Sequence, residues 1–127
     1  MKRAEEIYHR SLALMGENQR DENQPMKERA VPIINVLLSQ VYELELAMRG
    51  DTLRPGKVIP QITSLAETLP LFEPILYAVM PLGLAGFLLI EEETERGKFF
   101  LQLYHSEMEI LHSRCKRGVR HKIKRSV

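Results

Sequence analysis

Apolar residues recur at helical spacing through the first half of the chain and predict two amphipathic helices. Residues 3–15 form the first, and Gly16 follows as a helix stop. Its apolar face consists of Ala4, Ile7, Tyr8, Leu12 and Met15. Residues 25–49 form the second, from Pro25 to the position before Gly50. Its face consists of Ala30, Ile33, Ile34, Leu37, Leu38, Val41, Leu44 and Met48. Pro32 predicts either a kink or a later start of this helix.

Two further helices are predicted in the second half. Residues 71–91 are apolar almost all round, which is typical of a central helix, and Pro81 predicts a kink there. Gly83 and Gly86 within it indicate close helix packing. Residues 94–114 predict a fourth helix, which ends at 114 or further on. Its expected inner side consists of Phe99, Phe100, Leu103, Tyr104, Ile110 and Leu111.

The connections differ in length. Residues 17–24 are polar and predict a loop, whereas residues 51–70 form a long connection in which Pro55, Gly56 and Pro60 argue against regular structure. Ser64 and Glu67 have the spacing of a capping box, which predicts a short helical turn. A loop as long as 51–70 in a small domain is often functional. The fold class is therefore all-α: a compact bundle of about four helices with a long loop.

The charge distribution adds a C-terminal feature. Residues 1–113 hold 17 acidic and 11 basic residues, a net charge of −6, while residues 114–127 hold seven basic and no acidic residues, a net charge of +7. We expect a helical body at 1–113 and a basic tail at 114–127. The tail bases are Arg114, Lys116, Arg117, Arg120, Lys122, Lys124 and Arg125. They are suited to docking on an acidic protein surface or to contacting nucleic-acid phosphates. A disordered solubilising end is the third interpretation, and we favour docking on another copy or on a partner.

Candidate chemistry is sparse, and we expect no enzyme, metal or cofactor. The four histidines lack metal-binding spacing, and there is no CxxC pair. His112 and Cys115 lie three residues apart and could share a helix face, but we expect them to be two unrelated polar residues near a helix end. Nothing around Cys115 resembles an oxyanion hole. The glutamates at 91–95 favour a solvated helix start, and the single cysteine fits a reducing compartment.

A membrane span is the third-ranked interpretation. Residues 69–90 carry one charge, Glu73, and are long enough to cross a bilayer. Three prolines and two glycines interrupt this stretch, so we expect a buried helix and no membrane partner.

Several segments resemble the small helical head–tail connector (adaptor) proteins of tailed bacteriophages. EEIYHRSLALMG (5–16) is similar to the family's first helix, and ERAVPIINVLLSQVYELE (28–45) to its long core helix. Residues 62–110 are the most similar part: a Leu-Pro turn, an apolar helix, an acidic turn and a helix with paired phenylalanines and a tyrosine. The family-like core consists of Leu12, Leu37, Leu38, Leu82, Leu84, Phe99, Phe100 and Tyr104.

The resemblance implies a structural virion protein without enzymatic activity. Such proteins form homo-oligomeric rings, of about twelve subunits in this family, which close by rotation through heterologous contacts. It further implies a portal protein on one side, a downstream connector or tail protein on the other, and DNA in the channel without sequence-specific binding. The protein would be located in the virion, at the head–tail interface, and would be assembled there in the host cytoplasm. The alternative is a nucleic-acid-binding or regulatory helical module that acts through the basic tail.

Overall fold

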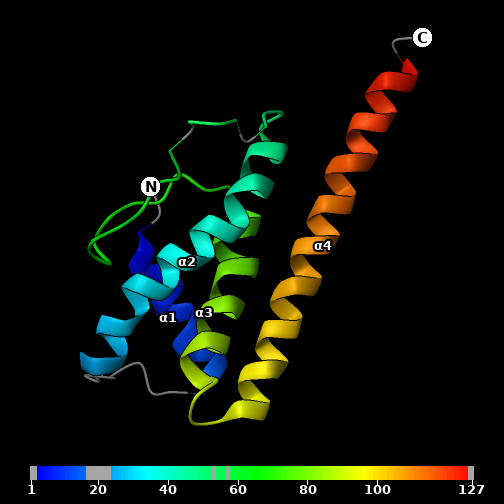
Figure 1. The fold of residues 1–127 in the computed structure, drawn as a ribbon. Coiled ribbons are helices and arrows are strands. Elements are labelled where there is room, and N and C mark those ends of the chain that lie inside the picture. The colour runs from blue at the N-terminus through cyan, green and yellow to red at the C-terminus, as the bar shows by residue number, and fades with distance from the viewer. Residues whose placement is uncertain (1–2, 17–23, 53, 57, 126–127) are drawn as a thin grey trace.

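The structure is a computed structural model that describes residues 3–16, 24–52, 54–56 and 58–125, with side chains up to residue 115 except that of Gln24 (Figure 1). This part of the chain contains four α-helices and no β-strand: α1 (Ala4–Met15), α2 (Gln24–Met48), α3 (Met80–Leu89) and α4 (Thr94–Arg125). A π-helical segment, η1 (Ile75–Val79), leads directly into α3. The predicted all-α class is confirmed. The polar loop expected at 17–24 lies almost wholly outside the described residues.

The prolines and glycines shape the helix boundaries. Gly16 ends α1 in the left-handed conformation, with φ of 81°, as predicted. Helix α2 begins at Gln24 and continues through Pro32. The alternative prediction that this helix starts after Pro32 is therefore wrong. The distortion expected at Pro81 lies in the turn before it, where Met80 N–H donates to the Ile75 carbonyl. Pro81 has no N–H and its ring crowds the carbonyl four residues earlier, and a widened π turn accommodates both effects.

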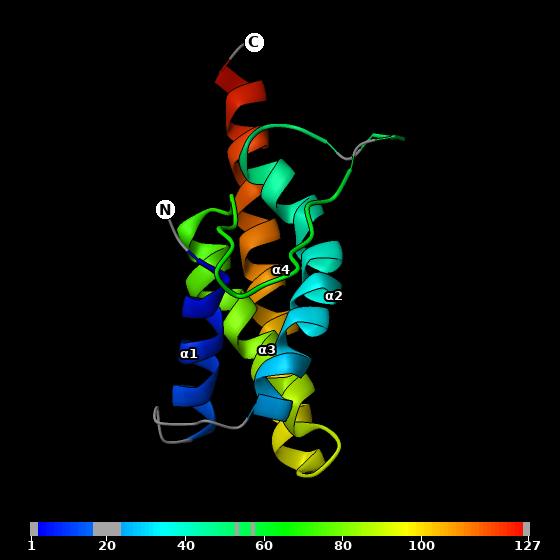
Figure 2. The same cartoon turned by 90° about the vertical axis from the view of Figure 1, so that its left-hand side faces the viewer.

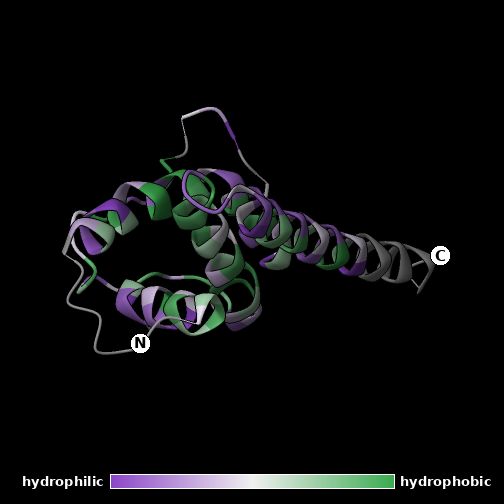
Figure 3. Cartoon of the chain, turned by 90° about the horizontal axis from the view of Figure 1, so that it is seen from below, coloured by the Kyte–Doolittle hydropathy of each residue, from purple (hydrophilic) through white to green (hydrophobic). Residues whose placement is uncertain are grey.

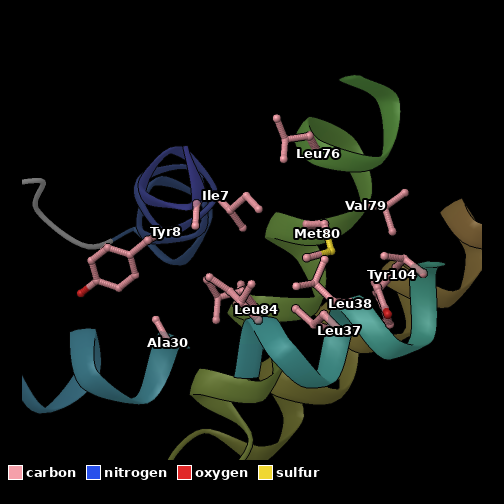
Figure 4. Packing of buried hydrophobic residues seen from close by; sticks show 14 of the residues in the cluster. Ile7, Tyr8, Ala30, Leu37, Leu38, Leu76, Val79, Met80, Leu84 and Tyr104 are labelled. Carbon is pink, nitrogen blue, oxygen red and sulfur yellow. The ribbon is translucent and has the colours of Figure 1, made fainter. Parts of the chain in front are cut away.

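Helix α3 occupies the centre, as its uniformly apolar sequence predicts. It contacts α1, α2 and α4, and Figure 2 shows it between α1 and α2 with α4 behind. Side chains from all four helices and η1 meet in one core, including Ile7, Leu37, Val79, Leu84 and Tyr104 (Figure 4). Burial of large apolar side chains, each worth about 1.5–3 kcal/mol, is what stabilises this arrangement.

Three glycines allow the backbones of the central helix and its neighbours to approach closely. A Cβ atom on Gly83 would lie 2.6 Å from Leu37 Cδ2, and one on Gly86 would lie 2.6 Å from Leu101 Cγ. A Cβ on Gly97 of α4 would lie 2.6 Å from the backbone Cα of Ile90. The close packing predicted at Gly83 and Gly86 is confirmed, and Gly97 is its counterpart on α4.

The second half of the 51–70 connection packs on the body. Ile62, Leu65 and Leu69 are buried in the core, and the Asn35 side chain bonds both to the backbone N–H of Ile62 (2.8 Å) and to its carbonyl (2.9 Å). Near residue 58 the connection is open to solvent, with Val58 83% exposed. The second half of the connection is therefore part of the helical body.

This connection also caps α1. Arg3 at the N-cap makes no side-chain capping bond, so the first N–H groups of the helix need other acceptors. The Glu67 carbonyl accepts from Ala4 N–H and the Leu65 carbonyl accepts from Glu5 N–H, both at 2.9 Å. In Figure 1 the green connection crosses from the end of α2 to the start of α1.

A compact turn sets those two carbonyls in place. The Glu67 carboxylate accepts hydrogen bonds from Thr63 N–H (2.6 Å), the Thr63 hydroxyl (2.9 Å) and Ser64 N–H (2.8 Å). These bonds, the one from Thr63 N–H first, lower the pKa of Glu67. The bond from Ser64 N–H is the one that a capping box makes. The segment nevertheless forms a non-helical turn, so the short helical turn predicted here is absent.

A buried carboxylate fixes the entry into the central helix. Glu45 of α2 is 1% exposed and accepts from Phe72 N–H at 3.0 Å and from the Arg49 guanidinium at 2.9 Å. Arg49 also donates to the Pro70 carbonyl. The Glu45 carboxylate is thus paired and hydrogen-bonded, as a buried charge requires. Its bonds connect the end of α2 to the segment before η1.

Replacing Gly97 by alanine tests the α3–α4 contact. At an exposed helix position, replacing glycine by alanine stabilises the helix by about 1 kcal/mol. At position 97, however, the added methyl group meets backbone atoms that cannot rotate away. We expect Gly97→Ala to lower the free energy of unfolding by about 1–3 kcal/mol, as overpacking does. Urea unfolding measures the change. Ser106→Ala, at an exposed position of the same helix, is the control and should be neutral or slightly stabilising; equal behaviour of both variants would contradict the contact.

Candidate interaction surface

Helix α4 extends past the rest of the bundle. It runs without a break from Thr94 to Arg125 and so crosses the boundary expected between the body and the basic tail. Figure 1 shows its C-terminal end projecting beyond the other helices, and in Figure 3 the coloured part of α4 already extends to the right of the bundle. The Arg114 side chain is exposed. The other six tail bases belong to the helix by their backbone (Lys116, Arg117, Arg120, Lys122, Lys124 and Arg125), and their side chains lie outside the described part.

The expected inner side of α4 divides into two faces. Phe100, Tyr104 and Leu111 are buried as predicted. The other three predicted inner residues are exposed, by 56% at Phe99, 37% at Leu103 and 43% at Ile110. Placing Phe99 in the core was therefore wrong. At about 100° per residue, positions 99, 103 and 110 fall on a face next to the one formed by 100, 104 and 111.

The remaining family-like core residues lie inside the bundle. Leu12, Leu37, Leu38, Leu84, Phe100 and Tyr104 are buried, and Leu82 is half-buried against the same cluster. The Tyr104 hydroxyl donates to Gln40 Oε1 at 2.8 Å and joins α4 to α2. Burial raises the pKa of Tyr104, so its phenol stays neutral and serves as a structural donor.

Four exposed glutamates form an acidic turn at the start of α4: Glu91, Glu92, Glu93 and Glu95. Two are engaged locally, since Glu93 pairs with Arg96 at 3.0 Å and Glu95 with Lys98 at 3.7 Å. Arg96 also donates to the Met15 carbonyl at 2.6 Å and satisfies the C-terminal end of α1. The acidic turn is a solvated helix start, as its sequence predicts, and it lies at the opposite end of α4 from the basic tail.

Two shallow surface grooves are lined entirely by residues that the structure describes. One, of about 310 Å³, lies between α2 and the end of α3 and is lined by Arg29, Pro32, Ile33, Phe87, Ile90 and Glu91. The other, of about 290 Å³, is lined by Glu5, Lys27, Glu28, Val31, Ser64, Leu65 and Ala66. Within the described ranges, no group of three His, Cys, Asp or Glu residues could hold a metal ion. Cys115 is half-buried against the core.

One helix in the described part of the chain is long and apolar enough to cross a membrane. It is Pro25–Met48, and not the 69–90 stretch, whose helical part Ile75–Leu89 is shorter. In its most apolar window 44% of the residues are buried inside the bundle. The core helix of a soluble protein passes the same test, so this is weak support for a span.

No protein-family profile, curated protein or solved structure matches the chain. The surface is therefore interpreted from its own residues. Three features converge on α4: an exposed apolar face, the acidic turn at one end and the basic tail at the other.

Two neighbouring aromatic residues test the division of α4 into an inner and an outer face. Phe100 is 8% exposed, whereas Phe99 lies outside and meets the Phe100 ring edge-on at 5.6 Å. We expect Phe100→Ala to cost about 3–5 kcal/mol of unfolding free energy. Phe99→Ala should cost less than about 1.5 kcal/mol, the range of one aromatic contact. Thermal and urea unfolding of both variants measure the difference, and similar losses would contradict the assignment.

Proposed function

We propose that this chain is a structural virion protein without enzymatic activity, a head–tail connector subunit of a tailed bacteriophage. Its place would be the ring between the portal and the tail, where it closes the DNA-filled head. The observation that carries the proposal is the projecting α4, which leaves a well-tied helical body and ends in seven bases. The resemblance of residues 5–16, 28–45 and 62–110 to connector proteins supports it.

The ties within the body suit a ring subunit. A ring closes only if each heterologous contact repeats the same rotation, so the contacting surfaces have to be held firmly. Loop carbonyls cap the start of α1, Arg96 binds its end, and Glu45 fixes the entry into η1. These bonds link segments far apart in the sequence and restrain the helices relative to one another.

The exposed apolar residues also suit an assembly. They lie on several sides of the bundle: Leu14 on α1, Val36 on α2, and Phe99, Leu103 and Ile110 on α4. A heterologous ring contact needs two different surfaces on each subunit. The basic tail would then dock on an acidic surface of the portal or of a neighbouring subunit, where charge complementarity speeds encounter and sets orientation.

Mixing with the portal protein encoded in the same genome tests this proposal. We expect the full chain to co-elute with the portal in gel filtration and to add a ring beneath it in electron micrographs. Replacing two tail bases (Arg120→Gln with Lys124→Gln) should weaken the association, because it removes charge from the docking segment. The matched control removes two body bases (Arg54→Gln with Lys98→Gln), both exposed, and should bind normally. Absence of any association between the full chain and that portal would refute the connector role.

A second candidate function is binding of nucleic acid through the same segment. The observation in its favour is that the backbone of the tail bases continues helix α4, so the bases follow one another along a single helix. Each phosphate neutralised by a base releases counterions, so such binding weakens steeply with salt.

Salt titrations of DNA binding distinguish this second candidate from the first. If the tail binds phosphates, removing two of its bases (Arg120→Gln with Lys124→Gln) should reduce the magnitude of the slope by about two. The slope is that of the logarithm of the DNA association constant against the logarithm of the salt concentration. The body variant with two bases removed should leave the slope unchanged. A flat slope for the unmodified chain, or equal losses in both variants, would exclude tail-mediated phosphate binding.

A further inference from the structure

The outer face of α4 has the spacing of a helix-pairing seam. Phe99, Leu103, Ser106, Ile110 and Ser113 follow one another at intervals of four, three, four and three residues, and all five are exposed. This alternation keeps one line of side chains facing a partner helix, as in coiled coils. We call these five residues the α4 seam.

The ends of α4 decide which partner fits the seam. The acidic turn precedes it, and Arg120, Lys122, Lys124 and Arg125 occupy the last turns of the helix. A second copy in parallel orientation would set like charges beside each other, which is unfavourable. A second copy in antiparallel orientation sets the acidic turn of each chain beside the basic end of the other.

Seam packing and charge pairing are satisfied by the same register. With Leu103 opposite Ser113 of the other copy, Ser106 lies opposite Ile110, so these four seam positions repeat in the antiparallel direction, while Phe99 lies opposite position 117. In that register residues 91–95 lie opposite residues 121–125. The acidic segment of each chain therefore lies at the level of Lys124 of the other, the position in 121–125 that continues the seam spacing.

We propose that α4 pairs with α4 of a second copy in antiparallel orientation and forms a two-fold symmetric dimer. The contact is isologous, with the same residues contributed by each chain. It goes beyond the connector role and does not depend on it. In the dimer the basic tail is occupied, so the dimer holds the chain in a form that cannot use that tail elsewhere. Three apolar and two serine positions per helix give a modest affinity and a concentration-dependent equilibrium.

Disulfide trapping tests the orientation. In a Cys115→Ser background, chains with Leu103→Cys and chains with Ser113→Cys are oxidised separately and as a mixture. We expect disulfide-linked dimers in the mixture only. Equivalent positions in the antiparallel pair lie ten residues apart along the helix, about 15 Å, which exceeds the Cα separation of about 7 Å that a disulfide spans. Self-linked dimers of either variant alone would overturn the proposal.

Sedimentation equilibrium tests the seam and the charges. Leu103→Lys should raise the dimer dissociation constant by about tenfold or more, because a charge is then buried in the apolar seam. Val36→Lys, at an exposed apolar position of α2, should leave it unchanged. The dimer should weaken between about 0.1 and 1 M salt as screening increases. Circular dichroism confirms that both variants fold. A monomer at every concentration, or equal effects of the two variants, would overturn the proposal.

Discussion

The close approach of α3 to α4 at Gly86 and Gly97 is the contact on which the rest of the structure depends. No side chain separates the two backbones there, and Gly97 lies directly against the backbone of Ile90. This contact fixes the path of the α3–α4 turn and the direction in which α4 leaves it. The direction in turn decides that Tyr104 and Leu111 face the core, and that Phe99 does not.

The central helix needs covering on every side because its residues are apolar all round. Helices α1, α2 and α4 provide most of that cover, and the second half of the 51–70 connection completes the body near η1. The same connection supplies the carbonyl acceptors for the first N–H groups of α1. It follows that this segment is mainly structural, and that the part near Val58 is the one left open to solvent.

The sequence predicted the helices well because apolar periodicity reflects burial directly, and all five positions of the apolar face predicted for α1 are buried. It misplaced Phe99, Leu103 and Ile110 because one helix carries two adjacent apolar faces, and periodicity alone does not say which one meets the core. The 4-3-4-3 spacing from Phe99 to Ser113 was the available signal. The capping of α1 was not predictable, since its acceptors are backbone carbonyls that no residue type reveals. Neither was the pairing of Glu45, which depends on where residue 72 lies in space.

The helical continuity of α4 changes the meaning of its charges. A basic segment on a flexible linker would explore many orientations, but a segment that continues a helix anchored at Gly97 points in one direction relative to the body. Its target must then present acidic groups along a line parallel to α4. The acidic turn of another copy meets this requirement in antiparallel pairing, and an acidic portal surface would have to meet it for the connector role. Because both would engage the same helix, one chain cannot satisfy both at once, and self-association opposes docking on any other acidic partner.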